Sequence, residues 1–96
     1  MNTDLKHKGE VIMTFEIEPN RIFNKDADGK VIAEITFPEV SSGVFVIDHT
    51  FVDDSLRGQG VASKLVQAAV DEIKNKGGQV KATCSYAKQW LEKHGL

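Results

Sequence analysis

One stretch of the chain, residues 46–76, constrains the fold more than any other. It reads as an apolar strand, a short acidic turn, the glycine loop Arg57-Gly58-Gln59-Gly60 and a helix. Apolar residues recur after the loop at spacings of three and four, which is the period of a helix with one face in a core. They are Val61, Leu65, Ala69 and Ile73, with Ala62, Val66 and Val70 beside them.

The glycine loop has the features of an anion-binding cradle. Gly58 and Gly60 lack a Cβ, so a bulky anion can approach the backbone closely. The first N–H groups of the helix have no intrahelical partner, and the helix dipole adds partial positive charge there. Together these features predict phosphate binding. A tight strand-to-helix turn without a ligand explains the same residues, so the loop alone leaves both interpretations open.

Length and composition limit the number of domains and the kinds of site that this chain can contain. Ninety-six residues suit one domain with one modest core, so we expect residues 1–96 to form it, with residues 1–9 as a frayed N-terminus. The single cysteine, Cys84, excludes an internal disulfide and offers no metal-ligand cluster. Since no apolar run is long enough for a signal peptide or a membrane span, we expect a cytoplasmic protein with no metal and no membrane contact.

The charge is unevenly distributed along the chain. The net charge of −2 argues against nucleic-acid binding. Residues 1–56 carry five Lys/Arg and eleven Asp/Glu, whereas residues 57–96 carry seven and three. A basic C-terminal half suits a polyanionic ligand, and an acidic N-terminal half suits a cationic amine. Ordinary solvated surface charge is the alternative.

The remaining patterns predict an α+β fold. We expect a mixed, mainly antiparallel sheet of about five strands, two helices and one parallel βαβ unit between Val44 and Cys84. The expected strands are 10–18, Arg21–Asn24, Lys30–Phe37, Val44–Val52 and Gln79–Cys84. The second helix should be Tyr86–His94, with Ser85 as its N-cap and with Ala87, Trp90 and Leu91 on its inner face.

Four finer expectations follow from the same reading. Ile17 should face inward in an alternating, half-buried strand. The nearly continuous apolar run Val44–Val52 should be a central strand covered on both faces. The sequence Asp26-Ala27-Asp28-Gly29 is typical of a hairpin turn and lacks the pattern of a calcium loop. Gly77-Gly78 should end the first helix.

The glycine loop also resembles that of a known family. Arg57, Gly60 and Ala62 fit the pattern Arg/Gln-x-x-Gly-x-Gly/Ala behind a β-strand. This resembles the acetyl-CoA pyrophosphate loop of the GNAT superfamily of N-acetyltransferases. The loop does not match a Walker-type loop, and it lacks the third glycine of a dinucleotide fold.

The C-terminal segment extends this resemblance to about residues 13–96. GNAT proteins often carry Asn at the end of a strand, Ala three residues on, Tyr four after that, and then Gly-Phe. The same positions here hold Cys84, Ala87, Leu91 and Gly95-Leu96. The short length, Asp48-His49-Thr50 and residues 84–88 resemble the small YjdJ-like group. The resemblance implies a minimal GNAT-like fold without two early helices.

The resemblance also implies a cofactor site, with acetyl-CoA as co-substrate. Phe51 and Val52 would offer backbone groups to the pantetheine arm. The amides of the loop and the first helical turn would bind the pyrophosphate, and Arg57 could pair with a phosphate directly. These residues are Arg57, Gly58, Gln59, Gly60, Val61 and Ala62, with Ser63 as a further candidate.

Catalytic residues are less defined. In this superfamily an amine usually attacks the thioester directly, with a backbone N–H, here that of Val52, polarising the carbonyl. The tyrosine that commonly protonates the departing thiolate is replaced by Leu91, so that role is vacant or passes to Tyr86, for which surface packing is the alternative.

Cys84 and His49 are the candidate catalytic side chains. Cys84 could accept the acetyl group covalently with His49 as its base, or act in the site without a covalent step, or simply fill space at a strand end. His49 could transfer protons in the cofactor cleft or be a structural histidine.

The resemblance therefore implies an acetyl-CoA-dependent N-acetyltransferase acting on a primary amine of unknown identity. The alternatives are an acetyl-CoA-binding sensor without efficient catalysis and a protein-interaction domain that binds no coenzyme. We expect a monomer or a weak homodimer.

Overall fold

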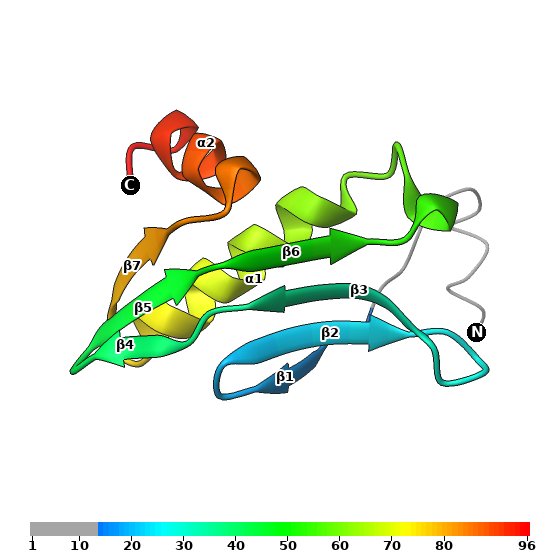
Figure 1. Cartoon of the computed structure of the whole chain (residues 1–96), viewed down its shortest axis with the longest axis horizontal. Helices are drawn as coiled ribbons and strands as arrows, with labels where there is room; N and C mark the ends of the chain where they lie inside the picture. The colour runs from blue at the N-terminus through cyan, green and yellow to red at the C-terminus, as the bar shows by residue number, and fades with distance from the viewer. Residues whose placement is uncertain (1–13) are drawn as a thin grey trace, which may run out of the picture.

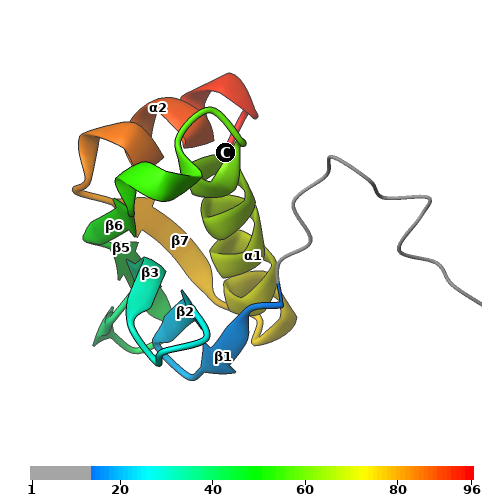
Figure 2. The same ribbon diagram turned by 90° about the vertical axis from the view of Figure 1, so that its right-hand side faces the viewer.

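The strands form a bent, mainly antiparallel layer, with one long helix across one face and a shorter helix beside that helix's N-terminal end (Figures 1 and 2). The structure is a computed structural model that describes residues 14–96. The expected frayed terminus and residues 10–13 of the first expected strand lie outside this range. The strands are β1 (Glu16–Glu18), β2 (Arg21–Lys25), β3 (Val31–Thr36), β4 (Glu39–Ser41), β5 (Val44–Ile47), β6 (His49–Val52) and β7 (Gln79–Ala82). The helices are η2 (Asp54–Leu56, a 3-10 turn), α1 (Val61–Asn75) and α2 (Ser85–Lys93).

The strands pair in two groups, which corrects the expectation of one sheet of about five strands. One group has the order β1-β2-β3-β6 and is antiparallel throughout. The other has the order β4-β5-β7, in which β5 pairs antiparallel with β4 and parallel with β7. The α+β class and the parallel unit around α1 are therefore confirmed.

The two groups share one long hairpin that bends in the middle. Val46 N donates to Pro38 O at 3.0 Å, so pairing continues from β4–β5 toward β3–β6. Asp48 N donates to Thr36 O at 3.2 Å, although His49 is the register partner of Thr36. Two residues therefore oppose one, which is the pattern of a β-bulge, and a bulge bends its strand.

The bulge explains why the strand predicted over Val44–Val52 appears as β5 and β6. The expectation that both of its faces are covered was wrong, since β6 alternates between exposed and half-buried residues. Thr50 and Val52 lie on the same face as the buried Ile35 and Ala33, whereas His49 faces away from the core. Within the described chain, β6 packs against the hydrophobic core only through its inner face, by Val52.

The core lies between the sheet and the two helices. The predicted buried stripe of α1 is confirmed, with Ala62 half-buried at its margin. The buried face of α2 consists of Ala87, Trp90 and Leu91, as predicted. Gly77, with φ of 74°, follows the end of α1. A Cβ on Gly78 would lie 2.8 Å from the Phe45 ring, so close packing requires glycine there.

Three local predictions were wrong. Ile17 is 58% exposed, because β1 is an edge strand and only the preceding Phe15 packs against the core. Strand β4 was missed, because three residues after a proline carry no readable alternation. Ser85 is the first residue of α2 rather than its cap; Cys84 occupies the N-cap position and makes no side-chain capping bond.

The turn between β2 and β3 is confirmed. Asp26 Oδ1 accepts hydrogen bonds from Asp28 N at 2.9 Å and Lys30 N at 3.0 Å. Gly29 has a φ of 84°, which an L-residue rarely adopts. The Asp26 carboxylate thus stabilises the turn itself.

Candidate functional site

The glycine loop turns left-handed at both glycines. Gly58 has φ of 78°, and Gly60, the N-cap of α1, has φ of 71° and ψ of 19°. A Cβ built on either glycine meets no atom within 4 Å, so open space lies in front of both. The glycines therefore serve the backbone conformation and leave the approach to the loop unobstructed.

The amides of this loop have no backbone partners within the described chain. Arg57 N donates to Asp54 O at 3.1 Å, and Lys64 N makes the first helical bond, to Gly60 O, at 3.1 Å. Between these two bonds, the amides of residues 58–63 donate to no acceptor among the described residues. The first turn of α1 carries no acidic side chain. Unpaired donors at the positive end of a helix dipole form an anion-binding site.

The segment before the loop is anchored by Asp53. Its N–H donates to Ile32 O at 2.8 Å, and its carboxylate accepts from Ser55 N at 3.0 Å and Ser55 Oγ at 2.7 Å. These bonds from Ser55, with a smaller contribution from Lys30, lower the pKa of Asp53. The loop is thus fixed to β3 before any ligand arrives.

Arg57 and Asp54 form an exposed ion pair at the start of the loop. Arg57 Nε lies 2.8 Å from Asp54 Oδ1, and the two side chains are 78% and 85% exposed. A pair this exposed contributes little to stability. The guanidinium has further N–H groups, so it can bind a phosphate oxygen while it keeps this contact.

A cavity of about 220 Å³ lies in front of the loop. It is bounded by the loop, the end of β6 and the start of α2. The lining residues are Val52, Leu56, Arg57, Gly58, Gly60, Val61, Ala62, Ser63 and Tyr86. The structure therefore brings most of the predicted cofactor residues to one cavity; Phe51 and Gln59 do not line it.

Strands β6 and β7 diverge next to this cavity, which Val52 of β6 lines, and leave a fork between them. Within the described chain, β6 pairs only with β3, and β7 pairs only with β5 (Figure 1). Thr83 N and Cys84 N both donate to Ile47 O, at 3.0 and 3.3 Å, and the chain then turns away into α2. The two strands therefore diverge directly after Ile47.

Backbone groups on the inner side of the fork come from alternate residues of β6. Asp53 N bonds to Ile32 O, so in the antiparallel ladder the main chain of Phe51 faces β3. The N–H and C=O groups of Thr50 and Val52 then face the opposite edge, toward the fork. Of the two predicted backbone contacts, Val52 has the suitable orientation.

Cys84 lies at the base of the fork, and His49 does not share its surroundings. Cys84 Sγ is 3.6 Å from Thr50 Oγ1 and is half-buried. His49 lies on the outer face of the sheet, where its Nε2 is 3.5 Å from Glu34 Oε1. Successive residues of a strand point to opposite faces, so the structure separates His49 from Cys84.

His49 belongs to a group of charged side chains on the outer face, and the sequence analysis did not single out its other members, Arg21 and Glu34. Glu34 Oε2 accepts a hydrogen bond from Arg21 Nε, and this carboxylate raises the pKa of Arg21. Glu34 therefore contacts Arg21 and His49 with its two oxygens. The residues come from three different strands, so no local sequence signal could have identified the group.

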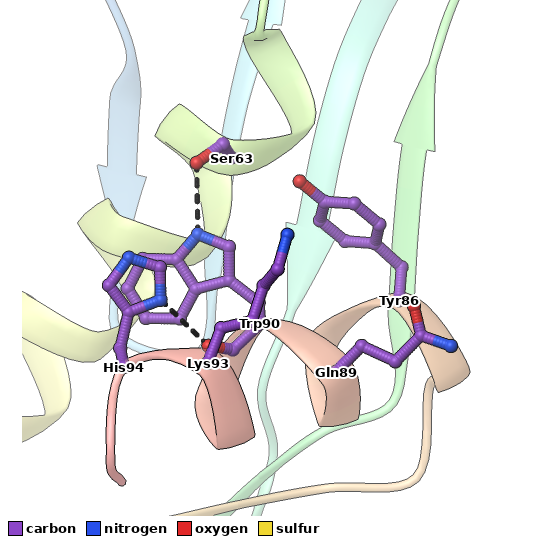
Figure 3. Close-up of a pocket in the computed structure, with 6 residues that line it drawn as sticks. All are labelled: Ser63, Tyr86, Gln89, Trp90, Lys93 and His94. Carbon is purple, nitrogen blue, oxygen red and sulfur yellow. Dashed lines mark hydrogen bonds between the residues drawn. The ribbon is translucent and has the colours of Figure 1, made fainter.

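Trp90 connects α2 to the cradle. It is a core residue, as predicted, with 6% of its surface exposed. Its Nε1 donates to Ser63 Oγ at 2.9 Å, in the first turn of α1 (Figure 3). A buried indole N–H requires a partner, which is the one signal that could have suggested this contact. Leu91, which the resemblance places at the position of the family tyrosine, is buried in the core.

Comparison with known proteins identifies the family. The sequence profile of the GCN5-related N-acetyl-transferase family matches residues 21–95. The chain belongs to this family. Protein NATD1 of Gallus gallus and of Mus musculus are each 28% identical to it over 64 residues. These residues are 67% of this chain and 58% of each relative, so the match spans little more than half of their length.

Solved structures show the same relationship. The solution structure of a protein described as a GCN5-like N-acetyltransferase from Staphylococcus aureus is 36% identical, with a TM-score of 0.70 over 85% of this chain and 80% of that one. A protein described as an acetyltransferase from Deinococcus radiodurans R1 has a TM-score of 0.58 at 23% identity, over 79% of this chain and 53% of that one. The second similarity supports the fold alone. The expected minimal GNAT fold is thus confirmed.

Enzymes of this family use acetyl-CoA, and the cavity fits its diphosphate. The unpaired amides of residues 58–63 and the unobstructed glycines are the features that fit. Within residues 14–96, no cluster of His, Cys, Asp or Glu side chains could hold a metal ion. No helix in this range is long and apolar enough to cross a membrane.

Proposed function

We propose that this chain is an acetyl-CoA-dependent N-acetyltransferase that moves an acetyl group to a primary amine. The observation that carries the proposal is the set of unpaired amides at residues 58–63, in a loop that lines a cavity together with Val52 at the end of β6. The diphosphate of the coenzyme binds these amides, and Arg57 adds a charged contact to it.

The pantetheine arm enters the fork and pairs with the edge of β6. The backbone groups of Thr50 and Val52 face this side and are the candidate partners. The thioester then lies near the base of the fork, close to Cys84. A backbone N–H of β6, that of Val52 as first candidate, polarises its carbonyl.

The coenzyme lies on the inner face of β6, and the acceptor amine reaches the thioester through the fork from the opposite face, the side of His49 and Glu34. The amine nitrogen forms a bond to the carbonyl carbon, and the carbon–sulfur bond breaks. His49 accepts the amine proton, and the nearby Glu34 carboxylate stabilises the imidazolium that forms. Tyr86, which lines the cavity, is the candidate proton donor to the departing thiolate.

Direct transfer is favoured over a covalent acetyl-cysteine step. His49, the predicted base for Cys84, lies on the other face of β6 and contacts Glu34 instead. Cys84 remains at the reaction centre in this proposal, as a side chain next to the thioester rather than as a nucleophile. Thiol release that depends completely on Cys84 would contradict this choice.

A coenzyme-binding sensor is the second candidate function. Leu91 occupies the position of the family's proton-donating tyrosine and is 7% exposed within the core. A leucine cannot donate a proton, and its burial keeps it out of the site. The cradle would then be retained while catalysis is slow.

Two measurements separate these functions. Thermal unfolding with acetyl-CoA tests the cradle, because ligand at roughly 100 times its dissociation constant adds about 2.7 kcal/mol to the unfolding free energy. Thiol release with a panel of primary amines tests turnover. Stabilisation without release supports the sensor, and no stabilisation refutes both functions. Release that persists in Cys84→Ala supports direct transfer.

A further inference from the structure

Strand β7 ends the order β4-β5-β7, and its outer edge has no partner among the described residues (Figure 1). Gln79 N donates to Gly43 O at 2.7 Å, so the main chain of Gln79 faces β5. Along a paired strand, alternate residues bond to the same neighbour. The N–H and C=O groups of Val80 and Ala82 therefore point away from β5, to the free edge.

The row of apolar side chains on the inner face is incomplete at this edge. Phe45 and Ile47 of β5 are 5% and 0% exposed. Their register partners on β7, Val80 and Ala82, pack against the same core but are only half-buried. Within residues 14–96, no strand lies beyond β7. A further strand on this edge would shield both side chains from water.

Strand β7 has little that would keep this edge from pairing. Free edges are usually protected by prolines, β-bulges or charged side chains. The strand contains no proline, and its register with β5 has no irregularity. Lys81, exposed on the outer face, is its one charged side chain. Lys81 therefore limits which strand can pair here, and in which register.

The strand is complementary to a second copy of itself in one antiparallel register. A register with Val80 opposite Ala82 would place the two Lys81 side chains directly opposite each other, and like charges there are destabilising. A register with Val80 opposite Val80 places Lys81 opposite Gln79 instead. In this register, apolar side chains meet on the inner face and polar side chains on the outer face.

We propose that two copies of this chain associate through the free edges of β7, paired antiparallel about a two-fold axis at Val80. Val80 N–H donates to Val80 O of the partner subunit, and the same bond is made in return. The axis is perpendicular to the strands' common plane, so the inner faces of both copies lie on one side. The β4-β5-β7 groups then join into one continuous sheet. The fork lies on the β5 side of β7, so both coenzyme sites stay open.

Sedimentation velocity of the parent protein from about 10 µM to about 1 mM tests the association. The contact is short, so we expect a weak dimer, with the mean mass rising from one copy toward two. Val80→Pro should stay monomeric, because proline removes the outward N–H and leaves the bonds to β5 in place. Its stabilisation by acetyl-CoA should equal that of the parent, because this edge lies away from the glycine loop.

Substitutions of Gln79 test the register without disturbing the core, because this side chain is exposed. Gln79→Glu places a carboxylate opposite Lys81 and should tighten the dimer. Gln79→Lys opposes two like charges and should weaken it. The pair occurs twice in a two-fold dimer, so each substitution should change the dissociation constant by about two- to thirtyfold.

Amide hydrogen exchange locates the contact. Exchange at Val80 and Ala82 should slow as the parent concentration rises. Protection of both amides in the monomer would overturn the inference, because another segment of this chain would then cover the edge.

Three further results would overturn the inference while the proposed function stands. They are a parent protein that stays monomeric throughout, a dimer that survives Val80→Pro, and equal dissociation constants for the two Gln79 variants. Urea unfolding shows whether Val80→Pro keeps the fold. If it does not, the Gln79 variants carry the test.

Discussion

Gly60→Ala should separate the ligand-binding role of the glycine loop from its role in the backbone. Gly60 has φ of 71°, and an added Cβ meets no atom within 4 Å, so its cost in the unliganded protein is conformational. A left-handed L-residue costs about 1–2 kcal/mol, and the smaller entropy of the unfolded chain returns about 0.4–1 kcal/mol. We expect a net loss of about 1 kcal/mol, or about 4–8 °C in Tm for a domain of this size.

Gly43→Ala is the matched control for this substitution. Gly43 has φ of 75° and equally open surroundings, but it lies in the turn between β4 and β5. The two variants should therefore lose similar stability without ligand. With acetyl-CoA at roughly 100 times the parent dissociation constant, the parent and Gly43→Ala should gain about 10–20 °C. Gly60→Ala should gain much less, because its methyl group occupies the space of a phosphate oxygen.

The assay is thermal unfolding followed by circular dichroism with increasing acetyl-CoA. The reasoning is refuted if Gly60→Ala and Gly43→Ala are stabilised equally, since an anion on these amides cannot ignore a new methyl group on the loop. A much larger loss in Gly60→Ala without ligand would show instead that the loop conformation depends on contacts beyond its backbone.

Three further predictions concern residues around the site. Ser63→Ala leaves the buried indole N–H of Trp90 unpaired, so urea unfolding should show a loss of about 1–3 kcal/mol; a smaller loss would mean that water replaces the hydroxyl. Asp53 has a lowered pKa, so Asp53→Asn should be less stable than the parent at neutral pH. That difference should fade as the pH falls below 3.8 through the folded-state pKa of Asp53, and a pH-independent difference would contradict it. Glu34→Gln should slow amine acetylation at unchanged acetyl-CoA affinity, as His49→Ala should; an unaltered rate in both excludes this pair from proton transfer.

Local sequence patterns predicted the elements whose causes are local. The apolar stripe of α1 is readable because helix periodicity and core burial coincide from Val61 to Ile73. The turn at Asp26–Gly29 and the end of α1 at Gly77 follow from side-chain and backbone preferences of single residues. The candidate cradle could be identified for the same reason, since its loop and helix N-terminus are adjacent in sequence.

Elements that depend on pairing were predicted less well. Ile17 fits an alternating pattern, but its strand lies at the edge, where that face has no neighbour to bury it. The run from Val44 to Val52 is nearly continuous in apolar and β-branched residues, yet the bulge at Asp48 and the departure of β7 after Ile47 divide it. Neither effect is encoded in the run itself.

The sequence by itself determined the strand–loop–helix unit and the family to which it belongs, because the glycines and the helix period act over neighbouring residues. Only the tertiary structure decided that His49 faces Glu34 while Cys84 faces Thr50 across the fork. It also decided that Trp90 of α2 reaches Ser63 in the first turn of α1. The physical reason is that strand register and helix docking assign each side chain to a face, and both are set by contacts between segments far apart in the chain.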